Sequence, residues 1–367
     1  MKKIGIIGGG INGLFVAKRL QDLGCQVDVY EKGQCLMQTS SASSKLLHGG
    51  IRYLEQGHLK VVRESLRDRA WWLANAPEFC WPIKIIMPVY KKSPRGVFKL
   101  FSGAQLYRFL AGRYSLGPTD FFGVQRTKEL YCDINHEGLS GSVSFFDAQM
   151  NEDRLGAWVL AGAKNSGCTI FEQTQVEKFT DSGEIYSARL GCQRYDLIIN
   201  ASGPWAAKLN QENGIETNHI LRLIRGSHIL IDRICSHPFL FQELSGNRVV
   251  FVLPYLGKTL VGTTEVPQSI DEKIECSVTE RNYLIDIFND NFVDPITASD
   301  ITEEFSGLRP IVSALSDGKS SHFSSASREY QIELHKKVLS IYGGKWTSAP
   351  SLSEKVVSTL IKSARIS

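Results

Sequence analysis

The segment Ser43–Glu55, with the sequence SSKLLHGGIRYLE, gathers a lysine, a histidine and an arginine around two adjacent glycines, just before an amphipathic run. An arginine side chain binds phosphate or carboxylate through a planar fork of donors, and a histidine exchanges a proton near neutral pH. Because the helix dipole disfavours a cation at a helix start, Arg52 at the mouth of the expected helix indicates a binding role. The alternative is a solvated Arg52 with Tyr53 in the core.

The N-terminal residues have the pattern of a dinucleotide-binding unit. A buried strand is predicted at residues 3–7, and a G-x-G-x-x-G sequence follows it at once. Apolar spacing then predicts a helix at residues 14–23. A second strand, at residues 26–30, leads to Glu31 about 20 residues after the glycines. Strand, glycines, helix, strand and acidic residue together are far more specific than the glycines alone.

Each residue of this fingerprint has an expected task. Gly8 makes the tight turn, Gly10 lets the backbone approach a pyrophosphate, and Gly13 lets the helix pack closely on the strand. The helix N-terminus faces the phosphates, and Glu31 accepts hydrogen bonds from the ribose. The fingerprint by itself leaves NAD and FAD open.

Two more strands end in small residues. The sequence YDLIIN runs into Ala201-Ser202-Gly203 with Trp205 close behind, and LSIY runs into Gly343-Gly344 before a C-terminal helix. Between them we expect a helix from Asp147 to Gly167, followed by a strand and a hairpin-like pair. The nucleotide domain is therefore predicted to be discontinuous. The serine-rich run after Glu31 suits the wrapping of a long cofactor, although composition alone also allows a flexible loop.

The intervening segments are expected to form a second domain. GSHILI, RVVFVLP and TLVGTTEV alternate as antiparallel strands do. We therefore predict an α/β fold in which a Rossmann-like FAD-binding domain is interleaved with an antiparallel-sheet substrate domain. The expected bounds are 1–75, 147–215 and 330–367 for the first domain, and 76–146 and 216–329 for the second.

Composition excludes several classes of protein. The chain has 367 residues, 43% of them hydrophobic, and a formal net charge of +4, which argues against a dedicated nucleic-acid binder. The eight cysteines contain no C-x-x-C pair and no metal-like spacing, so we expect reduced thiols, no metal and a cytoplasmic location. No stretch reaches the roughly 18 apolar residues of a spanning helix. Any membrane contact would be peripheral, on the inner face of the cytoplasmic membrane.

The chain resembles the FAD-dependent glycerol-3-phosphate dehydrogenases in the order of its motifs, which are GGGINGLFVA, SSASSKLLHGGIRYLE, INASGPWA, RLIRGSHI, FVLPY, VGTTEV, FSGLRP and YGGKWTS. That family belongs to a wider flavoenzyme group that includes the D-amino-acid and sarcosine oxidases. The similarity covers nearly the whole chain. SSKLLHGGIRYLE and SGLRP are much more specific to the glycerol phosphate branch than the general flavin motifs are. The resemblance implies FAD as the cofactor.

The residues that the resemblance implies for FAD binding come from the fingerprint, the serine-rich run, the strand ends and the C-terminal glycines. They are Gly8, Gly10, Asn12, Gly13, Glu31, Ser40, Ser43, Ser44, Lys45, His48, Gly49, Gly50, Val176, Ala201, Ser202, Gly203, Trp205, Gly344, Lys345, Trp346 and Thr347. In the family the segment with Gly49 and Gly50 crosses the flavin, so small residues are expected where the backbone passes the rings. His48 would contact the flavin, and in some relatives of the wider group a histidine is the covalent attachment point.

The resemblance also implies a reaction. Glycerol 3-phosphate, or a similar small phosphorylated or acidic secondary alcohol, would be oxidised to the ketone by hydride transfer to flavin. This needs a base for the hydroxyl proton and a grip on the remote anionic group. The implied catalytic residues are Arg309, His228, Arg52 and Lys345, and the implied substrate-binding residues are Arg52, Tyr53, Arg309, Lys345 and Thr347. Arg309 suits the grip best because its fork can bind a phosphate at two points.

Three of these side chains have structural alternatives. Arg309 could form an ion pair with Glu303 or Glu304, and Lys345 could lie on the surface. His228 lies in a strand-like run, so a core or cofactor-contacting histidine is as consistent with the sequence as a base.

Two departures from the family pattern bear on function. Family members commonly continue into a further helical domain, whereas this sequence stops about one helix after Lys345. The family's Thr-Thr-Tyr-Arg run is here Thr347-Ser348-Ala349-Pro350, which bears on the exact substrate. Two other functions stay open. One is an amino-acid or 2-hydroxy-acid oxidase or dehydrogenase of the wider group, whose arginine would hold a carboxylate. The other is a non-catalytic flavin-binding protein.

The electron acceptor is expected to be a quinone, a carrier protein or oxygen, because one fingerprint leaves no second site for NAD. Between Lys84 and Glu129 the chain has nine Lys or Arg against two acidic residues, threaded by VFKLFSGAQLYRFLAGRY. This combination suits an interfacial helix on an anionic membrane. The alternative is a cationic rim of the substrate domain whose apolar face is core.

Overall fold

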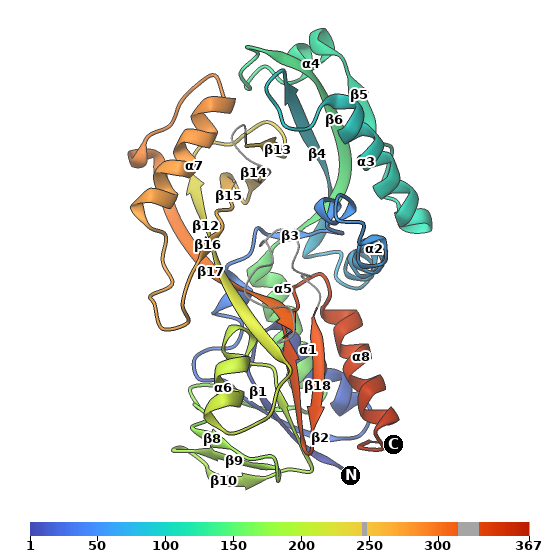
Figure 1. Cartoon of the computed structure of the whole chain (residues 1–367), viewed down its shortest axis with the longest axis vertical. Helices are drawn as coiled ribbons and strands as arrows, with labels where there is room; N and C mark the ends of the chain where they lie inside the picture. The colour runs from blue at the N-terminus through green and yellow to red at the C-terminus, as the bar shows by residue number, and fades with distance from the viewer. Residues whose placement is uncertain (244–247, 315–329, 367) are drawn as a thin grey trace.

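A computed structural model describes residues 1–243, 248–314 and 330–366 of the chain. Figure 1 shows an elongated molecule with one sheet in its lower half and a second, larger sheet in its upper half. The long strands β12 (His219–Ile231) and β17 (Ile301–Ala314) run from the upper half into the lower half.

The lower sheet has six strands in the order β18-β19-β11-β1-β2-β7. All its pairs are parallel except the edge pair of β18 with β19. Its strands are β1 (Lys3–Ile7), β2 (Gln26–Tyr30), β7 (Thr169–Phe171), β11 (Leu197–Asn200), β18 (Gln331–His335) and β19 (Val338–Tyr342). The central strands are almost entirely buried, as expected for a parallel sheet covered on both faces.

Three helices pack together beside this sheet: α1 (Ile11–Asp22), α5 (Glu152–Asn165) and α8 (Ala349–Lys362). Their apolar faces join the strands in one hydrophobic core. A small antiparallel sheet of β8 (Lys178–Phe179), β9 (Glu184–Ser187) and β10 (Gly191–Arg194) lies at the lower end of the molecule (Figure 1). This arrangement confirms the Rossmann-like part of the predicted fold.

The upper sheet has the strand order β16-β12-β15-β14-β13-β4-β6-β3, with β17 paired to β12 and β5 paired to β6. Its pairs are antiparallel apart from β13 with β4, so the antiparallel prediction is confirmed. Its remaining strands are β3 (Leu46–Leu47), β4 (Cys80–Tyr90), β5 (Asp120–Phe122), β6 (Leu139–Met150), β13 (Phe239–Gln242), β14 (Val249–Tyr255), β15 (Lys258–Gly262) and β16 (Val266–Pro267).

Most of the remaining helices cover or flank this sheet. They are α2 (Leu59–Asn75), α3 (Val97–Ala111), α4 (Val124–Leu130) and α7 (Val278–Asn291). The helix α6 (Ala206–Glu212) lies in the lower half of the molecule and packs on β19 (Figure 1). Short 3-10 turns lie at η1 (Thr39–Ser41), η2 (Ile51–Leu54), η3 (Gly112–Tyr114), η4 (Gly203–Trp205) and η5 (Ala298–Asp300).

Two local expectations were wrong. The helix expected from Asp147 begins at Glu152, because β6 continues to Met150 and the side chain of Asn151 then caps the helix by accepting from the Arg154 N–H. Arg52 is not in the first turn of a long helix.

Arg52 belongs to the turn η2, and α2 begins only at Leu59. Gly50 and Gly57 both have positive φ, 76° and 73°, and interrupt the helical path on either side of the turn. The helix-dipole argument for Arg52 therefore does not apply.

Candidate active site

A cavity of about 930 Å³ lies at the carboxyl ends of β1, β2, β11 and β19 and extends to β17. This edge of a parallel sheet is where open α/β folds bind their ligands. Its volume is at the upper end of the usual range for sites of small molecules and cofactors. The expected residues that line it are Gly8, Gly10, Asn12, Glu31, Ser40, Ser43, Ser44, His48, Tyr53, Val176, Ala201, Ser202, Gly203, Trp205, Arg309, Gly344, Lys345, Trp346 and Thr347.

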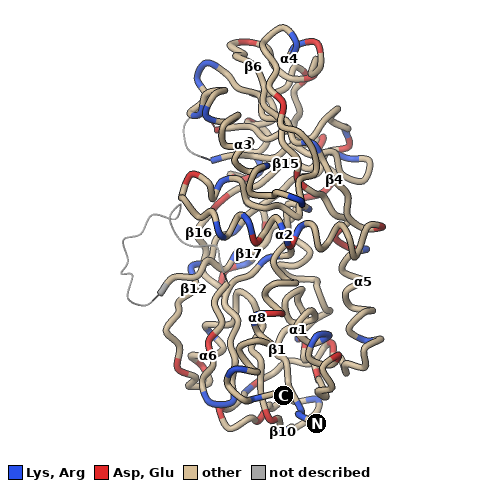
Figure 2. The backbone as a smooth tube through the Cα atoms, turned by 90° about the vertical axis from the view of Figure 1, so that its right-hand side faces the viewer, with Lys and Arg blue, Asp and Glu red and all other residues tan. Residues whose placement is uncertain are grey.

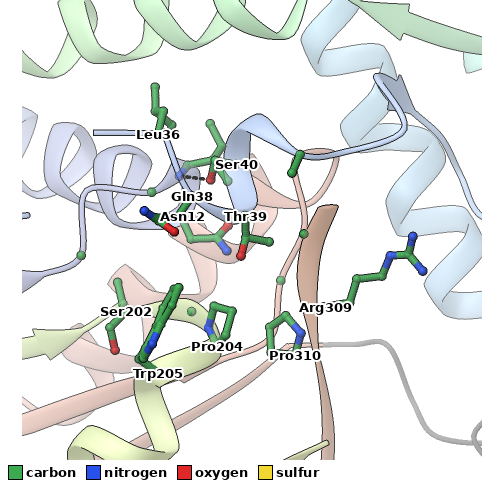
Figure 3. Close-up of a pocket in the computed structure, with 18 of the residues that line it drawn as sticks. Asn12, Leu36, Gln38, Thr39, Ser40, Ser202, Pro204, Trp205, Arg309 and Pro310 are labelled. Atoms are coloured by element: carbon green, nitrogen blue, oxygen red, sulfur yellow. Dashed lines mark hydrogen bonds between the residues drawn. The ribbon is translucent and has the colours of Figure 1, made fainter. Parts of the chain in front are cut away.

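Figure 3 shows how the walls face each other. Thr39 and Ser40 lie across the cavity from Pro204 and Trp205, and Arg309 lies farther away on β17. The Ser40 hydroxyl accepts a hydrogen bond from the N–H of Ile11, the first residue of α1, at 3.1 Å. Residues of the serine-rich run thus form one wall of the cavity.

The fingerprint has the local geometry that its glycines predict. Gly8 has φ +109°, and a Cβ there would lie 2.8 Å from the backbone carbon of Ala201. A Cβ on Gly13 would overlap the carbonyl oxygen of Gly8, so only glycine lets α1 approach β1 this closely. Glu31 lines the cavity while its two carboxylate oxygens accept the N–H groups of Gly9 and Gly33, at 2.8 and 2.9 Å.

Two buried polar atoms in the cavity wall have no hydrogen-bond partner among the described residues. They are the Oδ1 atom of Asn12 and the Nζ atom of Lys345, which lies 5.2 Å from the ring centre of Tyr53. Burying such groups without a partner is costly. Both residues line the cavity, so a polar ligand bound there could supply the missing partners.

Arg309 reaches the cavity from β17. Its Nη2 atom donates to the hydroxyl of Thr263 at 2.5 Å, and its Nη1 atom donates to the carbonyl of Thr264 at 3.5 Å. Glu304, one of the acidic partners considered for Arg309, is paired with Arg281 at 2.6 Å.

Thr264 is itself held by a buried carboxylate. Its hydroxyl donates to Glu280 of α7 at 2.6 Å, and Ser227 donates to the same oxygen at 2.8 Å. Burial would raise the pKa of Glu280, but the hydrogen bonds from Thr264, Arg225 and Ser227 outweigh it and lower that pKa to about 2. The turn that receives Arg309 is therefore anchored to a permanently charged group.

The structure places some expected residues outside the cavity wall: Gly13, Lys45, Gly49, Gly50, Arg52 and His228. Lys45 is buried in an ion pair with Glu152 and lies 4.6 Å from the ring centre of Phe305. Arg52, expected to point into the substrate cavity, is paired instead with Glu265 at 3.3 Å.

The glycines 49 and 50 serve packing inside the protein. A Cβ on Gly49 would overlap the Tyr107 hydroxyl and lie 2.6 Å from Leu66, and a Cβ on Gly50 would overlap the ring of Tyr53. Close passage of a flavin was the expected reason for small residues here. The structure gives a different reason, because protein atoms already fill both Cβ positions.

His228 is buried in the sheet beside the cavity. Its Nε2 atom lies 2.9 Å from the hydroxyl of Ser44, which does line the cavity, and its ring stacks on Phe305 with 4.9 Å between ring centres. Burial lowers the pKa of His228 well below its usual value, and the charges of Arg309 and Lys45 lower it further. The imidazole is therefore neutral at physiological pH.

A buried neutral histidine makes stability fall in acid. Below the unfolded pKa of about 6.5 the unfolded chain binds a proton that the folded chain does not, so the folded state loses about 1 kcal/mol between pH 6.5 and 5.5 from this residue. Above pH 6.5 the effect is absent. Urea titrations of wild type and His228→Asn at both pH values should show this difference as a smaller pH dependence in the variant. Equal pH dependence in both proteins would contradict the neutral assignment.

Sequence reasoning missed several lining residues, among them Leu36, Gln38, Thr39, Pro204 and Pro310. Thr39 stands inside the serine-rich run that was singled out, so its hydroxyl was a usable signal. Leu36 and the two prolines carry no chemical signal. They reach the cavity only through the path of the chain.

Comparison with known proteins shows the family to which the chain belongs. Residues 3–354 match the sequence profile described as DAO, FAD dependent oxidoreductase. The chain therefore belongs to the family of FAD-dependent oxidoreductases, and the expectation of FAD as its cofactor is confirmed. Within that family, the predicted resemblance to the glycerol-3-phosphate dehydrogenases is confirmed by the relatives.

A glycerol-3-phosphate dehydrogenase of Pseudomonas aeruginosa is 30% identical over 97% of this chain and 71% of its own length. A D-erythritol 1-phosphate dehydrogenase of Brucella abortus is 32% identical over 95% of this chain and 72% of its own. The structure of a Bacillus halodurans glycerol-3-phosphate dehydrogenase with FAD matches with a TM-score of 0.77 and 23% identity. This chain spans 65% of that protein's length.

The cavity fits FAD on its own geometry. The crowded Gly8–Gly13 turn, the start of α1 and the unpartnered Oδ1 atom of Asn12 lie where a dinucleotide would need donors and acceptors. When bound, FAD supplies the hydride acceptor. Within the described residues, no helix has the length and apolar character needed to span a bilayer.

Proposed function

We propose that the chain oxidises glycerol 3-phosphate, or a close relative such as D-erythritol 1-phosphate, to the corresponding ketone. The observation that carries the proposal is the buried ammonium of Lys345, which has no hydrogen-bond partner among the described residues and shares the cavity with Arg309. Two cations in one cavity suit a phosphate dianion better than a single carboxylate. The two relatives named for phosphorylated polyols support the same substrate class.

In this proposal Arg309 and Lys345 hold the phosphate, while Tyr53 and Thr347 line the space beside it. Arg52, which is paired with Glu265 and lies outside the cavity wall, has no part in holding the phosphate in this proposal. The proton of the substrate hydroxyl passes to Ser44 and from there to the neutral Nε2 of His228, because Ser44 stands between the cavity and the imidazole.

The division of the chain is part of the proposal. Residues 1–75, 147–215 and 330–367 would hold the cofactor, and residues 76–146 and 216–329 the substrate. The six parallel-sheet strands support it, since all of them lie in the first set. β3 (Leu46–Leu47) and the residues of β6 that it pairs with, Ala148 and Gln149, also fall in the first set, although both strands belong to the larger sheet.

The test is anaerobic reduction of the purified FAD protein across a panel of glycerol 3-phosphate, D-erythritol 1-phosphate, lactate, 2-hydroxyglutarate, glycerate and amino acids. Flavin bleaching by a phosphorylated polyol, with much slower bleaching by the others, is expected. Preference for an amino acid or 2-hydroxy acid would instead support an oxidase of the wider group. The glycine oxidase of Geobacillus kaustophilus has a fold similar to that of this chain, with a TM-score of 0.77 and 18% identity over 99% of this chain and 95% of the oxidase. No bleaching by any compound would support a non-catalytic flavin protein.

We also propose that electrons leave to a quinone at an anionic membrane surface, with α3 as the docking helix. Phe98 and Phe109 are 84% and 80% exposed, and their spacing of eleven residues puts them on one face of α3. The basic excess of this region is partly offset, since Arg95 and Lys99 pair with Glu55 and Lys84 pairs with Asp120. Figure 2 shows basic and acidic residues interspersed along the whole chain, so the exposed aromatics support docking more than the net charge does.

Changing both Phe98 and Phe109 to serine should lower binding to anionic vesicles at low salt at least tenfold, because two phenylalanine insertions are lost, each contributing about 1–2 kcal/mol.

Replacing Lys91, Lys92, Arg95 and Lys99 with glutamine should abolish that binding. Anaerobic flavin reduction should be unchanged in both variants, and a short-chain quinone should reoxidise wild type faster than oxygen does. Wild type that ignores vesicles at low salt, or that turns over fastest with oxygen, would show that α3 serves the fold alone.

A further inference from the structure

A buried carboxylate holds the cavity segment that carries His48. The side chain of Asp147, on β6, accepts from the N–H of Gly49 at 3.2 Å, from Arg69 at 3.1 Å and from the hydroxyl of Tyr107 at 3.0 Å. Arg69, Tyr107 and Asp147 are 1%, 2% and 2% exposed. Side chains of α2 and α3 thus both bond the β6 carboxylate that accepts the Gly49 N–H.

The strand pairing explains why a side chain is used here. Leu46 and Leu47 of β3 pair with Gln149 and Ala148 of β6, and the ladder ends there. The chain then turns toward the cavity. In a longer ladder the N–H of Gly49 would bond the backbone of β6, whereas here it donates to the side-chain carboxylate of Asp147.

The other side of this segment faces the cofactor cavity. The N–H of His48 donates to the hydroxyl of Thr347 at 3.2 Å, and both residues line the cavity. Behind the segment, the Tyr107 hydroxyl and Leu66 fill the space of the missing Gly49 side chain. Residues 48–50 therefore lie between two fixed partners. Thr347 bonds the segment on the cavity side, and Asp147, held by Arg69 and Tyr107, bonds it on the opposite side.

We propose that Asp147 is a positioning residue for the flavin reaction. With Arg69 and Tyr107 it sets how far the His48–Gly50 segment projects into the cavity, and so where His48 and the neighbouring Tyr53 stand relative to flavin and substrate. The proposal rests on FAD as the cofactor and on no particular substrate. Displacement of a reacting group by about 1 Å can slow a reaction about 100-fold, so a clamp of this kind has a measurable effect.

The deciding variants are Asp147→Asn and Tyr107→Phe. Asparagine keeps an acceptor for Gly49 but removes the charge that compensates buried Arg69. The Tyr107→Phe variant keeps the ion pair of Asp147 with Arg69 but lacks the hydroxyl that donates to Asp147. Tyr90→Phe is the matched control, because Tyr90 is a largely buried tyrosine whose hydroxyl donates to the Asn135 carbonyl, and it does not line the cavity.

The measurements are kcat and KM for the substrate that reduces wild type fastest, and the visible spectrum and reduction potential of the bound flavin. We expect kcat to fall about 10- to 100-fold in Asp147→Asn and about 3- to 10-fold in Tyr107→Phe, with KM changing less than about threefold. The spectrum and potential should shift in both variants and stay at wild-type values in Tyr90→Phe. If Asp147→Asn fails to fold, Tyr107→Phe alone decides.

Folded, FAD-loaded variants with wild-type kcat, spectrum and potential would overturn the proposal and leave Asp147 as a purely structural residue. If no compound in the panel reduced wild type, the proposed function would fail. The spectrum and the potential would still test Asp147, because neither needs a substrate.

Discussion

Replacing Arg309 with alanine should lower kcat/KM for the phosphorylated substrate about 10²- to 10⁴-fold. Each charge-assisted hydrogen bond contributes about 1.5–3 kcal/mol, and the guanidinium can give two to a phosphate. Arg309→Lys should recover only part of the loss, since an ammonium cannot reproduce the planar fork. Steady-state kinetics with glycerol 3-phosphate and D-erythritol 1-phosphate give the measurement.

The control for Arg309 is Arg281→Ala. Arg281 is paired with Glu304 of the same strand that carries Arg309, and it is not part of the cavity wall. This variant should keep kcat/KM within about twofold, because the ion pair that it loses is partly exposed and lies outside the cavity wall. Wild-type rates in Arg309→Ala would mean that the phosphate is held elsewhere in the cavity.

Replacing Gly13 with valine should remove FAD almost completely. A Cβ at this position overlaps the carbonyl oxygen of Gly8, so α1 must move away from β1 and the turn around Gly10 must open. The measurement is the visible flavin absorbance relative to protein absorbance after gel filtration, together with far-UV circular dichroism to confirm folding.

Gly103→Val is the matched control for this loss. Gly103 also lies inside a helix, α3, but nothing stands within 4 Å of its Cβ position. Valine there carries the same cost in helix propensity without the overlap, so the protein should stay yellow. A folded Gly13→Val protein that keeps its full FAD content would contradict the role assigned to this turn.

Local sequence was enough to predict the cofactor end of the site. The strand at Lys3–Ile7 and the glycine turn are set by neighbouring residues, since conformational freedom and close packing at Gly8 and Gly13 are local properties. The helix expected at residues 14–23 is present but begins earlier, at Ile11. The strand ends at Ala201 and Gly343 were found in the same way. Motif order then predicted the family and FAD, both confirmed by the comparisons.

Only the tertiary structure decided what the individual side chains contact. Arg52 meets Glu265, which is 213 positions away, and His228 meets Ser44 at 184 positions. Gly49 is small because Tyr107 of α3 stands behind it, a contact that the sequence around Gly49 does not encode. Periodicity and motif spacing report which residues share a local element and which face is apolar. The pairing of side chains across distant elements depends on how the two sheets pack, and that is set by the whole chain at once.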